Sequence, residues 1–142
     1  MRRDAGFTLI ELMIVVVIIG ILAAIAIPNF IAMQDRAKEG STKANMHTLQ
    51  LAAEDYGVQN GGCYASSGAA VVPLMPGGNA NFRNSFTKLT GANVAWEDRA
   101  VYAGPASAIP GITSYADSGN ATYNVKGYGK TGSITIVLSS GY

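Results

Sequence analysis

A single carboxylate lies inside a long apolar run near the start of this 142-residue chain. Glu11 is the only charged residue between Phe7 and Met33. A helix of that length can cross a hydrocarbon core of about 30 Å, and an acid inside such a helix is costly to bury. Glu11 is therefore a functional candidate. Two roles are open to it: an acid in the first helical turn that the helix dipole stabilises, or the partner of a cation on a neighbouring molecule.

The other polar residues indicate little chemistry. His47 is the only histidine, and no residue pattern around it forms a nucleophile and base pair, so we expect it on a solvated helix face. Asp117 precedes Ser-Gly-Asn, but one carboxylate is fewer than calcium sites use, so a turn is expected there. The sequence therefore predicts no enzymatic activity, no metal site and no cofactor.

Charge and cysteine content exclude further classes. The formal net charge is +1, and without residues 1–6 eight basic and eight acidic side chains remain. That balance leaves no basic patch for a specific nucleic-acid partner. Cys63 is the only cysteine, so the chain cannot close a disulfide on itself. We expect Cys63 to be a small half-buried residue, or otherwise to bridge to another molecule.

The first quarter of the chain resembles the N-terminal signature of type IV pilins and of the pseudopilins of type II secretion. The family pattern is a basic leader that ends in Gly, then Phe, then Thr-Leu-(Ile/Leu)-Glu and a long apolar helix. Gly6, Phe7 and Glu11 occupy the matching positions, and the match continues through Gly20 and Pro28. The layout is similar to that of a type IVa major pilin precursor with a class III leader. It departs from the many pilins that close a C-terminal loop with a disulfide.

The resemblance implies a processing site and an assembly role. In the family a membrane-embedded prepilin peptidase cuts after the Gly and methylates the new N-terminal residue, which here gives a cut between Gly6 and Phe7 and a methyl group on Phe7. Glu11 would then pair with the Phe7 amine of a neighbouring subunit and fix the axial register of the helices. Arg2 and Arg3 favour a cytoplasmic N-terminus with the head outside.

One long helix is predicted from Phe7 to about Asn60, ended by Gly57 and by Gly61-Gly62. Pro28 cannot donate a hydrogen bond to the carbonyl one turn earlier, so a kink is expected there. The segment from Gly20 to Pro28 is expected to be the softest part of the helix. It is either a simple kink at the membrane exit or, as in the family, a segment that unwinds on assembly.

Apolar residues at three- and four-residue spacings predict which face of the helix packs on the head. The predicted face contains Phe30, Met33, Ala37 and Ala44, followed by Met46, Leu49, Ala53 and Tyr56.

The expected fold is α+β, with a small antiparallel sheet of three or four strands on the second half of the helix. Strands are predicted at Val94–Ala103, Ala121–Tyr128 and Ser133–Ser139, with a weaker candidate near Ile112–Tyr115. We expect an irregular connection over Cys63–Gly78 and a short amphipathic helix carrying Phe82, Phe86 and Leu89. The predicted organisation is a leader peptide (1–6), a transmembrane and assembly half of the helix (7–33), and a globular head with the amphipathic half (34–142).

Three functional hypotheses follow. The first is a structural subunit that polymerises into a type IV pilus. The second is a pseudopilin of a type II secretion system or a minor pilin, and the third is a monomeric anchored domain. Asp117 is the only acid after Asp98, which argues against the calcium-loaded heads common among major pseudopilins. The resemblance implies five partners: other copies of the chain, the prepilin peptidase and methylase, an inner-membrane assembly platform, its ATPase, and membrane lipid before assembly. It also implies an inner-membrane precursor with a periplasmic head and then an extracellular filament.

Overall fold

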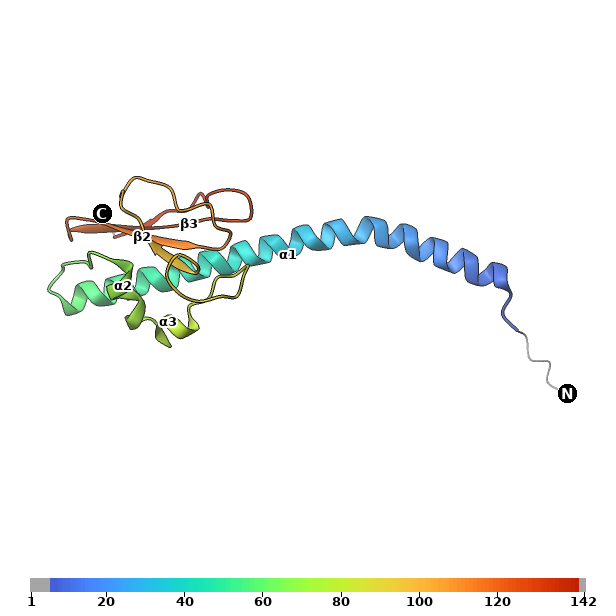
Figure 1. Cartoon of the computed structure of the whole chain (residues 1–142), viewed down its shortest axis with the longest axis horizontal. Helices are drawn as coiled ribbons and strands as arrows, with labels where there is room; N and C mark the ends of the chain where they lie inside the picture. Colours follow the sequence, from blue (N-terminus) through green and yellow to red (C-terminus); the bar gives the residue numbers. More distant parts are fainter. Residues whose placement is uncertain (1–5, 141–142) are drawn as a thin grey trace. The chain divides into compact units, whose positions relative to one another are not determined.

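One helix, α1 (Leu9–Gln59), accounts for more than a third of the computed structural model, which describes residues 6–140 (Figure 1). The chain divides after Asp35 into two compact units. The first contains the apolar part of α1. The second contains the rest of α1 and the head. The bounds of α1 confirm the predicted helix from Phe7 to Asn60 to within two residues at each end.

Glycine ends α1 in the way that the sequence predicts for Gly61-Gly62. Both residues have positive φ, 65° and 92°, which favours residues without a Cβ. The Gly62 N–H donates to the Gly57 carbonyl at 2.8 Å, which is the long bond of a Schellman motif. Gly57 itself is helical and buried, and a Cβ there would lie 2.9 Å from the Tyr64 ring. Its role is therefore close packing rather than helix termination.

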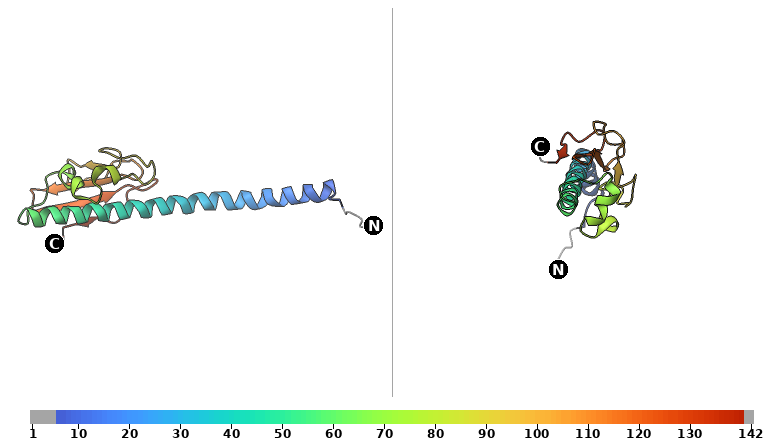
Figure 2. Two further views of the ribbon diagram at one scale, coloured as in Figure 1. Left: turned by 90° about the horizontal axis from the view of Figure 1, so that it is seen from below. Right: turned by 90° about the vertical axis from the view of Figure 1, so that its left-hand side faces the viewer.

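The head contains a four-stranded sheet in the order β1-β2-β3-β4. The strands are β1 (Trp96–Asp98), β2 (Thr113–Ser118), β3 (Thr122–Gly127) and β4 (Leu138–Ser139). Figure 2 shows them against the green and teal part of α1. The expected α+β fold is confirmed. Its sheet is mixed, because β1 pairs with β2 in parallel while the other two pairs are antiparallel.

The core lies between α1 and the sheet. Its most buried side chains come from one face of α1 and from β2 and β3: Met46, Leu49, Ala53, Tyr115, Tyr123 and Val125. Each lies at 1% exposure or less, and full burial of one such side chain contributes about 1.5–3 kcal/mol.

Two short helical segments interrupt the predicted irregular connection Cys63–Gly78: α2 (Gly68–Val71) and the 3-10 turn η1 (Val72–Leu74). A third, α3 (Gly78–Asn81), begins at its last residue. The helix predicted around Phe82, Phe86 and Leu89 is wrong. The Asn84 side-chain oxygen accepts the N–H groups of Phe86 and Thr87, and this local turn competes with helical hydrogen bonds.

The strand predicted at Ala121–Tyr128 is confirmed by β3 to within one residue at each end. The other strand predictions were correct in place but wrong in length. Val94–Ala103 contains only the three-residue β1, whereas the weaker candidate near Ile112–Tyr115 is the six-residue β2. Ser133–Ser139 contains only β4 and a single bridge from Ser133 to Tyr128. The predicted turn at Asp117 connects β2 to β3, with Gly119 and Asn120 both at positive φ.

Candidate functional site

The start of α1 is a capping box formed by Thr8 and Glu11. The Thr8 N–H and hydroxyl both donate to Glu11 Oε2, at 2.9 and 2.6 Å, and the Glu11 N–H donates to the Thr8 hydroxyl at 3.3 Å. Such reciprocal bonds satisfy N–H groups that a helix start would otherwise leave unpaired. The sequence signal for this capping box is Thr-x-x-Glu directly before an apolar run. The sequence-based interpretation of Glu11 did not include Thr8 as its hydrogen-bond partner.

Glu11 retains a free oxygen in this arrangement. Both bonds from Thr8 go to Oε2, and Oε1 accepts no hydrogen bond from any residue in the range 6–140. Phe7, the predicted new N-terminus, precedes the cap and is 83% exposed. The carboxylate can thus cap its own helix and still offer one oxygen to a cation. Arg2 and Arg3, the predicted topology signal, lie outside the described residues.

The apolar half of α1 has no protein partner within its own unit. Among the described residues, α1 is long and apolar enough to cross a membrane. Its large side chains from Leu9 to Met33 are about half exposed or more. A Cβ on Gly20 would meet nothing within 4 Å, so no neighbouring group requires glycine there. The helix continues without a break through Pro28.

The second half of α1 is apolar on two opposite faces. The predicted packing residues Met46, Leu49 and Ala53 are buried, and Tyr56 packs against the same core. The other predicted set is wrong for this structure, because Phe30, Met33, Ala37 and Ala44 are exposed. In the head unit, exposed apolar residues recur every seven positions at Ala37, Ala44, Leu51 and Val58, which we call the outward strip.

The outward strip lies about opposite the buried face, because Leu51 follows Met46 by five residues at about 100° each. Leu51 is 71% and Val58 82% exposed. Spacing alone cannot separate two apolar faces of one helix, which is why the prediction assigned Ala37 and Ala44 to the core.

A glutamate on α1 holds two tyrosines of the head. Tyr123 and Tyr64 donate to the two oxygens of Glu54, at 2.6 and 3.1 Å. Tyr123 also stacks on Tyr115 with ring centroids 5.6 Å apart. Burial, and then the bond to Glu54, raise the pKa of Tyr123, and burial raises the pKa of Tyr115. The phenols therefore stay neutral and serve as structural hydrogen-bond donors.

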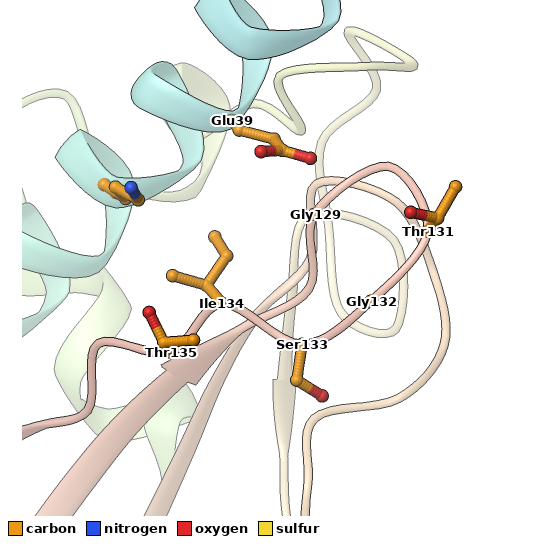
Figure 3. Close-up of a pocket in the computed structure, with 8 residues that line it drawn as sticks. Glu39, Gly129, Thr131, Gly132, Ser133, Ile134 and Thr135 are labelled. Atoms are coloured by element: carbon orange, nitrogen blue, oxygen red, sulfur yellow. The ribbon is translucent and has the colours of Figure 1, made fainter.

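Figure 3 shows an open pocket of about 270 Å³ between α1 and the turn that follows β3. Glu39 points its carboxylate at this turn and accepts the Lys130 N–H at 2.9 Å. A Cβ on Gly129 would lie 2.7 Å from that carboxylate, so glycine permits the approach. The Thr131 and Ser133 side chains point away from Glu39 (Figure 3). The pocket therefore anchors a turn and contains no convergent set of reactive groups.

The remaining candidates have no catalytic arrangement. His47 is exposed, as predicted. Cys63 is free and exposed, so the expected half-buried position is wrong. Within residues 6–140, no three His, Cys, Asp or Glu side chains lie together as metal ligands would.

The chain thus combines a capped apolar helix with a small α+β head. Residues 1–27 match the family model described as the prokaryotic N-terminal methylation motif. Together with this motif, the chain is similar to type IV pilins and to type II secretion core proteins.

The similar proteins include both pilins and secretion components. The chain is 61% identical over 54 residues to the type IV major pilin protein PilA of Myxococcus xanthus, covering 38% of this chain and 24% of that protein. It is 43% identical over 74 residues to the type IV wide pilus major component PilA4 of Thermus thermophilus, covering 52% and 56%. It is 38% identical over 85 residues to the type II secretion system core protein G of Pseudomonas aeruginosa, covering 58% and 59%.

The chain thus spans between 24% and 59% of the length of these three relatives. No solved structure matches it.

Proposed function

We propose that this chain is a structural subunit that polymerises into a type IV pilus on the bacterial cell surface. Its principal partner is then another copy of itself. The alternative is a pseudopilin of a type II secretion system or a minor pilin. The alternative is supported by the match to a core protein G, which extends over 85 residues, further than the 54 residues of the PilA match.

The outward strip is the observation that carries the proposal. A head anchored as a monomer needs only one apolar face on the second half of α1, which packs on the sheet. Here Ala37, Ala44, Leu51 and Val58 supply a second, exposed face. Apolar positions repeated every seven residues suit packing between helices, and the small side chains of Ala37 and Ala44 permit a close approach.

Glu11 supplies the register of that packing in the proposal. After a cut between Gly6 and Phe7, the new amine lies next to the cap, and Glu11 Oε1 is available to the amine of a neighbouring copy. Attraction between such charges is many-fold stronger at low dielectric than in water. A single pair in an otherwise apolar bundle specifies which axial offset is correct.

The remaining steps rest on the family. The proposal includes cleavage and Phe7 methylation by a prepilin peptidase, a cytoplasmic N-terminus, a periplasmic head, and extraction from the inner membrane by an assembly platform with its ATPase. The leader is residues 1–6, the assembly half of the helix is residues 7–33, and the head is residues 34–142.

Electron microscopy of sheared surface material, combined with mass spectrometry of its subunits, tests the proposal. We expect long filaments in which this chain is the predominant protein. Filaments in which it is a trace component would favour the minor pilin. A strain that retains the chain in the membrane and lacks filaments would favour the pseudopilin or the anchored monomer.

A further inference from the structure

Positively charged side chains gather at the end of the head where its part of α1 begins. The segment 83–88 packs on this stretch of the helix, with Lys38 Nζ 5.6 Å from the centre of the Phe86 ring. The turn after β3 lies beside the same stretch, because the Lys130 N–H donates to Glu39 at 2.9 Å. We call the cations of these three segments the basic end: Arg36, Lys38, Lys43, Arg83, Lys88 and Lys130.

The basic end carries most of the positive charge of the chain that follows residues 1–6. It holds six of the eight cations in that part, and only two acids, Asp35 and Glu39, lie on the same stretch of α1. Glu39 is engaged with the turn after β3. The charge balance of the whole chain predicted no basic patch, whereas the fold gathers one at this end. The other acids of the head lie further along α1 or in the sheet: Glu54, Asp55, Glu97, Asp98 and Asp117.

Four cations of the basic end are exposed and have no acidic partner among residues 6–140. The side chains of Arg36, Lys43 and Lys88 make no hydrogen bond or ion pair there, and Arg83 donates only to the Lys88 carbonyl. Lys88 also has a φ of 64°, a left-handed conformation that glycine or asparagine adopts with less strain. Backbone preference therefore does not explain a lysine at this position, and a use for its charge is indicated.

The basic end follows the apolar run of α1 closely along the chain. The helix is continuous, and Arg36 comes three residues after Met33, where the apolar run ends. At a rise of 1.5 Å per residue, Arg36 lies about 5 Å and Lys43 about 15 Å along the helix from Met33. The headgroup layer on each side of a bilayer is about 5–8 Å deep. Long Lys and Arg side chains can extend several ångströms towards it, so these cations are within reach of the headgroups.

We propose that the basic end docks on anionic phospholipid headgroups of the membrane that holds the apolar half of α1. Insertion of that half rests on the proposed function, and the contact with headgroups goes beyond it. Phosphate groups accept charge-assisted hydrogen bonds from Lys and Arg. Each cation near an anionic membrane surface strengthens the attraction about fivefold. Because α1 tethers the head to this surface, lipid is present at a higher effective concentration than a free polyanion such as nucleic acid.

Fluorescence quenching of the full chain in lipid nanodiscs tests the inference. A dye is attached to Thr87→Cys in a Cys63→Ser background, and the discs contain a lipid with a nitroxide on its headgroup. Discs that include phosphatidylglycerol should quench this dye several-fold more than discs of phosphatidylcholine alone, and salt near 1 M should remove the difference by screening. A dye on the native Cys63, which follows the other end of α1, should show no dependence on lipid charge.

Charge variants in the same labelled chain identify the cations responsible. Lys88→Gln should lower the ratio of docked to undocked heads about fivefold in the anionic discs, and Arg83→Gln should act in the same way. Ser118→Glu is the matched control and should be quenched like the parent chain. It lowers the net charge by the same amount at the turn between β2 and β3, which lies at the Cys63 end of the head because the Tyr64 N–H donates to the Asn120 carbonyl.

Three results would overturn the inference. The first is equal quenching in the two kinds of disc, and the second is quenching of Lys88→Gln at the level of the parent chain. The third is release of the head from anionic discs by a short DNA duplex at physiological salt, which would assign the cations to nucleic acid. None of these measurements depends on filaments, so an absence of filaments from cells would contradict the proposed function alone.

Discussion

Glu11 combines a cap within its own helix with a charge available to a second molecule, and substitutions can separate the two roles. Glutamine serves in a capping box but carries no charge. As sole subunit, Glu11→Gln should therefore be processed and inserted, yet give few or no fibres. Glu11→Val should fail in the same way, although it removes the cost of an acid in the membrane. Fibre yield after shearing is the measurement.

Thr8→Val is the matched control for Glu11. It removes the side-chain part of the cap, which costs about 1 kcal/mol, and keeps the carboxylate. Fibres should persist in this variant. Normal fibre yield from Glu11→Gln would leave Glu11 as a helix cap only.

The second prediction for single residues concerns processing between Gly6 and Phe7. The mature subunit should lack the first six residues, begin at Phe7 and carry one N-methyl group. Gly6→Val should block the cut, because a branched side chain crowds a peptidase site that accepts glycine. Intact-mass measurement of assembled material checks both points, and retention of Met1 in fibres would contradict them.

Along α1, the segment from Gly20 to Pro28 is a predicted weak point even though the helix is continuous there. Glycine costs about 1 kcal/mol relative to alanine within a helix, and proline removes one hydrogen bond. This stretch should be the first to lose helical hydrogen bonds when subunits assemble. A filament map resolved well enough to trace the main chain provides the test. An unbroken helix from Leu9 to Gln59 in that map would refute the prediction.

The two faces of α1 predict opposite outcomes for two leucines. Leu49→Ala empties a fully buried site and should lower the free energy of unfolding by about 2–5 kcal/mol. Leu51→Ala, at 71% exposure, should change it by less than about 0.5 kcal/mol. Urea unfolding of the detergent-solubilised chain can be followed through the fluorescence of Trp96, the single tryptophan, which is buried in the head. Equal losses from both variants would contradict the assignment of the faces.

The sequence predicted α1 well because a long apolar run and two glycines mark its ends. It did not distinguish the buried face from the outward strip, since both repeat at helical spacing. The helix around Phe82 failed because a single side chain, Asn84, redirects two N–H groups. At the site, the capping box was recognisable in Thr8 and Glu11. Pairing with a second subunit was suggested only by family resemblance, because it depends on another molecule.

For the whole molecule, a substitution in the outward strip should distinguish a subunit that polymerises from an anchored monomer. Leu51→Glu should leave the Trp96 unfolding transition unchanged, because the side chain is exposed, and should strongly reduce fibre yield by placing a charge in a helix contact. Leu89→Glu, which changes an exposed leucine elsewhere on the head, serves as its control. Fibres from Leu51→Glu at the wild-type yield would remove the main support for the proposed assembly.

The way in which β3 holds residues 100–107 has a consequence for how this protein can change over generations. Within this segment, Arg99, Asn124 and Lys126 donate to main-chain carbonyl oxygens, which every amino acid supplies. Mutations at Val101, Ala103 or Pro105 can therefore alter the chemistry displayed on the head while the bonds beneath persist. The exposed side chains of this segment can thus vary without a change in the hydrogen bonds that fix its main chain.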